Sequence, residues 1–158
     1  MAIVAVIAAI GMAGWRNARV RGNETAAVGA LTSINHAQFA FSQTCGNGRY
    51  APTLQALGTP IPTSGDAFLS LDLAREAPVV KSGYQFVMGG TEDPNQKTSC
   101  TGVVPLQGYQ LTGEPLTPGI TGTRFFGTNT DRIIYADAVT YSGNMPETGA
   151  PGHGAEIK

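Results

Sequence analysis

The chain has few of the residues that catalysis and metal binding need: only two cysteines and two histidines, with 13% charged residues. A metal site built on Cys45 and Cys100 would need further Cys or His ligands, and His36 and His153 are not spaced to supply them. A catalytic nucleophile needs a base within hydrogen-bond reach. The two histidines fall in a predicted helix and a glycine-rich tail, where we expect both to be exposed. We therefore expect no catalytic residues, no metal and no cofactor.

The chain also lacks an excess of positive or negative charge, since its formal net charge is −1. A nucleic-acid-binding domain usually shows a basic face, so no specific nucleic-acid partner is expected. The acidic turn at 92–95 lacks the alternating ligands of an EF-hand, which favours a solvated turn over a Ca²⁺ site. With 21 Gly and 10 Pro, but 42% hydrophobic residues, the composition excludes both an all-helical domain and a disordered chain.

Long hydrophobic runs are absent except at the start, where residues 1–14 (MAIVAVIAAIGMAG) are apolar or small. At ~1.5 Å per residue they span ~21 Å, short of the ~30 Å core of a bilayer. Either the sequence begins inside a longer segment, or this segment never spans a bilayer alone. Its charges follow it, unlike those of a secretory signal. Because the run is apolar all round, a membrane anchor or assembly element is favoured over a buried core helix.

This run continues without a loop into an amphipathic helix that ends near Cys45. The apolar residues recur at three- and four-residue steps, which predicts one stripe that lies on a sheet; they are Val20, Ala27, Val28, Leu31, Ile34, Ala37 and Phe41. Polar residues are expected on the other faces, namely Asn17, Arg21, Thr25, Thr32 and Asn35. Glycines weaken a helix by ~1 kcal/mol each relative to Ala. Gly11, Gly14 and Gly22 are therefore candidates for local unwinding.

The remainder, roughly 110 residues, is enough for one small domain. Residues 46–80 are predicted to be a connecting loop with short helical pieces at 52–57 and 68–75. Four strands are then expected, paired consecutively and antiparallel; they are 83–88, 108–111 extending towards 116, 123–127 and 132–139. Residues 140–158 are predicted to be a tail or surface loop. Because an N-terminal anchor indicates an oxidising compartment, a disulfide between Cys45 and Cys100 is favoured over free or metal-bound thiols.

These features resemble the type IV pilin and pseudopilin family. The resemblance is closest in 18–41 (ARVRGNETAAVGALTSINHAQFAF), with a basic residue pair, an Asn-Glu step, and small residues leading to Ile-Asn and Ala-Gln. It is looser at 83–90 (GYQFVMGG) and 117–135. It implies an α+β fold in which a long N-terminal helix packs on a small antiparallel sheet. Residues 1–22 would form the filament core or membrane anchor, and residues 23–158 the pilin head.

The implied function is structural: a subunit of a helical extracellular filament, a type IV pilus, made of identical copies. Before assembly the subunit would be anchored in the inner membrane, and the pilus assembly machinery would add it to the filament. We expect assembly contacts from Met1, Ile3, Val4, Val6, Ile7, Ile10, Met12, Trp15, Arg16 and Arg19. The arginines have three open interpretations: contacts with neighbouring subunits, contacts with lipid headgroups, or solvated charges.

The chain departs from the family pattern in two places. The family has a glutamate at its fifth position, whereas here position 5 is Ala and the first acid is Glu24. We therefore expect the processed N-terminus to precede this sequence. The mid-helix proline is also absent, which leaves Gly11 and Gly14 as the unwinding candidates. Two alternatives stay open, a pseudopilin of a type II secretion system and a membrane-tethered periplasmic binding module. The choice among adhesion, motility, DNA uptake and secretion is also open.

Overall fold

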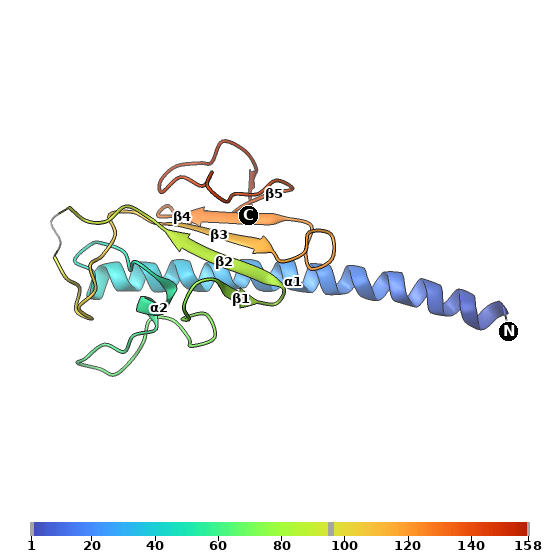
Figure 1. Ribbon diagram of the computed structural model, residues 1–158, viewed down its shortest axis with the longest axis horizontal. Helices are drawn as coiled ribbons and strands as arrows, with labels where there is room; N and C mark the ends of the chain where they lie inside the picture. Colours follow the sequence, from blue (N-terminus) through green and yellow to red (C-terminus); the bar gives the residue numbers. More distant parts are fainter. Residues whose placement is uncertain (1, 95–96, 158) are drawn as a thin grey trace.

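The computed structural model describes residues 2–94 and 97–157, with side chains described from Gly14 onward. One long helix and a sheet make up most of the fold (Figure 1). The elements in chain order are α1 (Ala2–Thr44), α2 (Leu54–Leu57), β1 (Val79–Lys81), β2 (Tyr84–Gly89), β3 (Gln110–Pro115), β4 (Phe125–Asn129), β5 (Tyr135–Asp137) and β6 (Ala155–Glu156).

The sheet has six strands in the order β1-β2-β3-β4-β5-β6, each antiparallel to its neighbour. It packs along the C-terminal half of α1 (Figure 1). The predicted α+β class, a long helix on a small antiparallel sheet, is therefore confirmed. Strands β2 to β5 correspond to the four predicted segments, with the last reduced to three residues. The edge strands β1 and β6 were not predicted, because two or three residues carry too little pattern to be recognised.

The helix buries the stripe that its periodicity predicts. Ala27, Leu31, Ile34, Ala37 and Phe41 are all at most 4% exposed and contribute to the main core. The sheet supplies the other side of this core, because every second side chain of a strand points towards α1. The aromatic and aliphatic side chains on this face include Phe86, Leu111 and Phe126.

Asn35 corrects one prediction, since it is buried rather than on an outer face. Its amide donates to Oγ1 of Thr128 at 2.9 Å, and its carbonyl oxygen accepts from the hydroxyl of Tyr109 at 2.9 Å. A buried amide is tolerated when both its ends are hydrogen-bonded. The partners come from β4 and from the residue before β3, so the sequence near Asn35 held no sign of them.

The helix predicted at 68–75 is wrong, since this segment consists of bends and turns. One turn closes where the amide of Ala74 donates to the carbonyl of Ser70 at 2.9 Å, and it does not continue. Leu69 and Leu73 nevertheless reach the core. An isolated helix of two turns is marginal in water, and here packing of the two leucines fixes an irregular backbone instead.

The C-terminal segment is likewise more than a surface loop. Gly113 in β3 faces Leu31 of α1, so its strand neighbour Thr112 faces away from the helix. Gly127 is paired with Thr112 and therefore also faces away from the helix. Tyr141 and Met145 pack against that outer position and are at most 3% exposed. Figure 1 shows this segment, in dark red, on the side of the sheet away from α1. The tail therefore forms a third, partial layer over a sheet whose other face α1 covers.

Glycine positions differ sharply in what they tolerate, which gives a first prediction. A Cβ on Gly29 would meet no atom within 4 Å, whereas a Cβ on Gly90 would lie 2.1 Å from the carbonyl oxygen of Gly108. We expect Gly29→Ala to raise the free energy of unfolding by about 1 kcal/mol, and Gly90→Ala to lower it by about 1–3 kcal/mol. Urea denaturation followed by circular dichroism measures both, and equal effects of the two substitutions would contradict the prediction.

Candidate assembly surface

The candidate functional site lies where α1 leaves the sheet. In Figure 1 the first turns of α1 extend past the end of the sheet, and no other described element lies beside them. Residues 14–19 are exposed, and the indole of Trp15 is 64% exposed. The apolar part of the helix thus projects from a head that is packed only around its C-terminal half.

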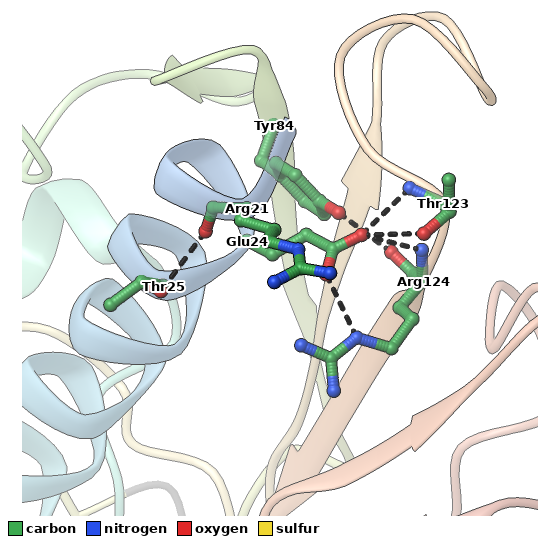
Figure 2. A network of polar contacts seen from close by, with 6 residues as sticks. All are labelled: Arg21, Glu24, Thr25, Tyr84, Thr123 and Arg124. Carbon is green, nitrogen blue, oxygen red and sulfur yellow. Dashed lines mark hydrogen bonds and ion pairs between the residues drawn. The ribbon is translucent and has the colours of Figure 1, made fainter. Parts of the chain in front are cut away.

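Glu24 fixes the helix to the sheet at this exit point (Figure 2). Its Oε1 accepts hydrogen bonds from the backbone amide of Thr123 at 2.8 Å, the hydroxyl of Thr123 at 2.7 Å and the backbone amide of Arg124 at 3.2 Å. Its Oε2 accepts from Nε of Arg124 at 2.9 Å. Glu24 is 5% exposed. A buried carboxylate is stable only when paired and hydrogen-bonded, and here both oxygens are engaged.

The pKa of Glu24 reports the balance of these contacts. Burial alone would raise it, but the hydrogen bonds from Thr123 and Arg124, together with the charge of Arg124, outweigh burial and hold the pKa below its ordinary value. The arginine itself is half exposed and lies over the ring of Phe126, with 5.3 Å between its Cζ and the ring centroid. The ionised carboxylate is therefore the form that ties α1 to the start of β4.

The loop between β3 and β4 is held close to the helix by further contacts. The side-chain amide of Asn23 donates to the carbonyl of Thr121 at 2.8 Å, and the hydroxyl of Tyr84 donates to the carbonyl of Arg124 at 2.8 Å. Gly83 has a φ of 74°, and a Cβ there would lie 2.9 Å from the Cβ of Thr121. Only glycine fits both that backbone conformation and that approach. The turn before β2 and the β3–β4 loop consequently meet beside α1.

A cleft of about 390 Å³ opens between these loops and the helix. Its lining comes from three segments of the chain, namely Trp15, Arg16, Arg19 and Asn23 on α1, Ser82 and Gly83 before β2, and Ile120 and Thr121 in the β3–β4 loop. The guanidinium of Arg19 lies over the indole of Trp15, 5.5 Å from the ring centroid. Ile120 is 59% exposed at the tip of its loop. The cleft is therefore apolar at its rim and cationic on its helical wall.

Of the predicted assembly residues, the structure brings Trp15, Arg16 and Arg19 together at this cleft. The side chains of Met1, Ile3, Val4, Val6, Ile7, Ile10 and Met12 lie outside the described residues. The helix is continuous through Gly11, Gly14 and Gly22 in this single chain. Unwinding at those glycines therefore stays a prediction, now confined to the assembled subunit.

Sequence reasoning missed the Glu24 contacts, although one signal pointed to them. Glu24 stands on the same helical stripe as Ala27 and Leu31, three and seven residues before them. A lone acid on a buried stripe needs a partner from elsewhere in the fold. The identity of that partner, 100 residues away in Arg124, could not be read from local pattern.

The predicted disulfide is confirmed, with Cys45 bonded to Cys100 and their Cα atoms 4.9 Å apart. It joins the end of α1 to the loop between β2 and β3, at the opposite end of the head from the cleft (Figure 1). The amide of Cys100 also donates to the carbonyl of Cys45 at 3.1 Å. The bond therefore closes the end of the helix against the sheet's longest connection.

His36 confirms the expected exposure, whereas His153 and Asp93 of the acidic turn are more buried than predicted. His36 is exposed as predicted, whereas His153 is half-buried: its Nδ1 lies 2.8 Å from a carboxylate oxygen of Asp137, and its ring stacks on Tyr141. In the acidic turn, Asp93 is buried with a carboxylate oxygen 3.6 Å from Nε of Arg49. Asn95 lies outside the described residues. Within the described part of the chain, no three His, Cys, Asp or Glu side chains gather as a metal site requires.

Two further findings concern the membrane and known proteins. Among the described residues, no helix combines the length and hydropathy needed to cross a bilayer. Comparisons with protein-family models, curated proteins and solved structures gave no match to this chain.

Proposed function

We propose that this protein is the structural subunit of a helical extracellular filament of the type IV pilus kind, assembled through its N-terminal helix. One observation carries the proposal: a single unbroken helix is covered by a sheet over its C-terminal half and projects from the head over its apolar half (Figure 1). An apolar segment that extends beyond the head would be costly to leave in water. Burial among the helices of identical neighbours would remove that cost.

The outer face of α1 supports the same proposal. From residue 25 to residue 44 the helix contains no Asp, Glu, Lys or Arg, although one side of it faces solvent. Exposed hydroxyls on that side donate to the helix's own carbonyls, as Thr25, Thr32 and Ser33 do to residues four positions earlier. A solvent-facing helix side usually carries charges. An uncharged side with satisfied hydroxyls is suited to burial against neighbours.

The association would be head-to-tail, so that each subunit presents a different surface to the next and the assembly grows without closing. Small residues in the apolar segment let helices approach closely; they are Ala2, Ala5, Ala8, Ala9, Gly11, Ala13 and Gly14. Before assembly the subunit would be held in the inner membrane by this segment, and the pilus assembly machinery would transfer it into the filament.

Removal of the apolar segment tests the proposal. A fragment of residues 23–158 keeps Glu24 and the contacts of Asn23 with the β3–β4 loop. We expect it to be monomeric by analytical ultracentrifugation, with the sheet signal of the full chain in circular dichroism. The full chain is expected to form regular fibres in electron microscopy.

A point variant separates the loss of length from the loss of hydrophobicity. Ile7→Asp in the full chain places a charge in the apolar segment and is expected to abolish fibres without changing the melting temperature of the head. Arg75→Gln, an exposed change on the connecting loop, serves as the control and should leave fibres intact. Fibres formed by the 23–158 fragment would falsify the proposal.

The cleft beside Trp15 favours one different function, a tethered binding module that uses the same loops to hold a ligand. Such a protein would stay monomeric in the membrane, so the absence of fibres from the native source would favour it. A type II secretion pseudopilin, the alternative within the family, would form short periplasmic fibres rather than long surface ones.

A further inference from the structure

We propose that the cleft between α1 and the β3–β4 loop binds the phosphate of an anionic phospholipid headgroup while the subunit waits in the membrane. The inference depends on the proposed function in one respect, that the apolar residues 1–14 lie in a bilayer before assembly. It adds a partner of defined chemistry to the same surface. The cleft measures about 390 Å³, a size that admits a glycerophosphate group.

The helical wall of the cleft carries positive charge that is not paired with an acid. Arg16 and Arg19 line the cleft, and Arg21 follows them on the helix. Among the described residues none of these arginines forms an ion pair with an acid. The nearest acid in sequence, Glu24, already directs both oxygens at Thr123 and Arg124. An arginine fork matches phosphate oxygens bidentately, which makes a phosphate a suitable counter-charge.

Trp15 and the arginines lie along the helix at the level expected of lipid headgroups. Trp15 stands directly after the apolar run and directly before the first arginine. Tryptophan is enriched at the level of lipid headgroups, where its ring has an apolar body and a polar N–H. Ile120 reaches the same level from the β3–β4 loop and is 59% exposed. Along the helix, the apolar segment is followed by the indole and then by the guanidinium. A phospholipid has the matching order of acyl chain, glycerol and phosphate.

The chemistry of the cleft disfavours other occupants. Residues 1–14 of a second copy carry no acid, so these residues would bury Arg16 and Arg19 without a counter-charge. Nucleic acid would need a larger basic face than a chain of net charge −1 provides. A lipid supplies both the phosphate and an apolar neighbour for Trp15 and Ile120.

Vesicle binding of the full chain tests the inference. The readout is the ratio of affinities for vesicles of phosphatidylglycerol mixed with phosphatidylcholine and vesicles of phosphatidylcholine alone, because insertion of the apolar segment contributes to both. General attraction to an anionic surface gives at most about a fivefold gain in affinity for each arginine, and we expect a cleft arginine that holds the phosphate to reach at least that value. We expect Arg16→Gln with Arg19→Gln to lower the ratio roughly 25-fold.

Arg21→Gln is the matched control, since it removes the same charge from the same helix but does not line the cleft. It should lower the ratio less than either cleft arginine. Trp15 is the only tryptophan in the chain, so its fluorescence reports on the cleft directly. The extra blue shift with anionic vesicles, relative to neutral vesicles, should persist in Arg21→Gln and disappear in the double variant. Equal losses from all three arginines would overturn the cleft in favour of general surface attraction.

A second measurement identifies the source of the phosphate. With the full chain in neutral detergent micelles, a short-chain phosphatidylglycerol should shift the amide NMR signals of Ser82, Gly83 and Thr121. Inorganic phosphate should shift them much less. Equal responses to both would overturn a lipid site, as would shifts confined to the arginine side chains.

The two proposals fail separately. Fibres without any preference for anionic lipid would remove the lipid site and leave the filament subunit standing. A clear preference for anionic lipid without fibres would keep the lipid site and remove the filament subunit, because monomers in vesicles suffice for the binding test.

Discussion

Replacement of Cys45 by serine is expected to lower the free energy of unfolding of the 23–158 fragment by about 4 kcal/mol. The bond closes a loop of 55 residues, and in the chain-entropy model a loop of this length restricts the unfolded state by roughly that amount. A small domain has a total stability of about 5–15 kcal/mol, so the loss is a large part of it. Urea denaturation of the fragment measures the change.

The matched comparisons are Cys100→Ser and the double variant. Because either substitution already breaks the bond, the free energy of unfolding of the double variant should differ from that of each single variant by only a few tenths of a kcal/mol. Wild-type fragment treated with a reductant should match them. An intact mass spectrum that shows two free thiols in native protein would contradict the prediction at its first step.

The same substitution should leave the filament's helical packing unchanged, because the bond lies at the far end of the head from the apolar segment (Figure 1). The filaments should nevertheless dissociate and be proteolysed more readily, since each head unfolds more easily. Electron microscopy reports the packing, and protease digestion reports the stability. A changed helical symmetry would show that the bond acts on assembly itself.

Glu24→Gln is expected to cost about 3 kcal/mol, the second largest effect. An amide keeps one acceptor for Thr123, but its NH₂ group faces donors of Thr123 or Arg124 and leaves buried donors unpaired. Glu76→Gln provides the control, an exposed glutamate that loses the same charge. It should change stability by no more than about 0.5 kcal/mol. Similar losses in both variants would assign the effect to net charge rather than to the buried contacts.

The pH dependence gives the sign of the Glu24 contribution. Its pKa is lowered in the folded chain from the model-peptide value of 4.5. The contribution is therefore fully present above pH 4.5 and is lost as the pH falls through the lower, folded-state pKa. The stability difference between wild type and Glu24→Gln should shrink over that acid range and be constant at neutral pH. A difference that stays the same down to pH 2 would refute an ionised Glu24.

Other carboxylates contribute to the same acid range. Contacts with Lys81 and Ser70 hold the pKa of Asp72 at about 2, and the hydrogen bond to His153 lowers that of Asp137. Both side chains are partly exposed, so solvent screens their contribution. The free energy of unfolding of the Glu24→Gln variant should therefore still decline at low pH, but less steeply than that of wild type.

Features that depend on local pattern were predictable from the sequence. The 3- and 4-residue spacing from Ala27 to Phe41 identified the buried face of α1, because a helix repeats every 3.6 residues. Gly, Pro and Asn between apolar runs identified β2 to β5 and their consecutive pairing. Two cysteines in a chain with an apolar N-terminus allowed a single pairing, which the fold contains.

Features that depend on distant partners were decided only by the tertiary structure. Glu24 and Asn35 are buried because β4 and its flanking residues supply hydrogen bonds that no neighbouring residue could supply. Tyr141 and Met145 form an outer layer because Gly127 leaves room for them on the sheet. The cleft beside Trp15 exists because Gly83 allows two loops to meet against α1. Burial, partner choice and close approach are properties of pairs far apart in the chain, whereas periodicity and turn chemistry are properties of each segment alone.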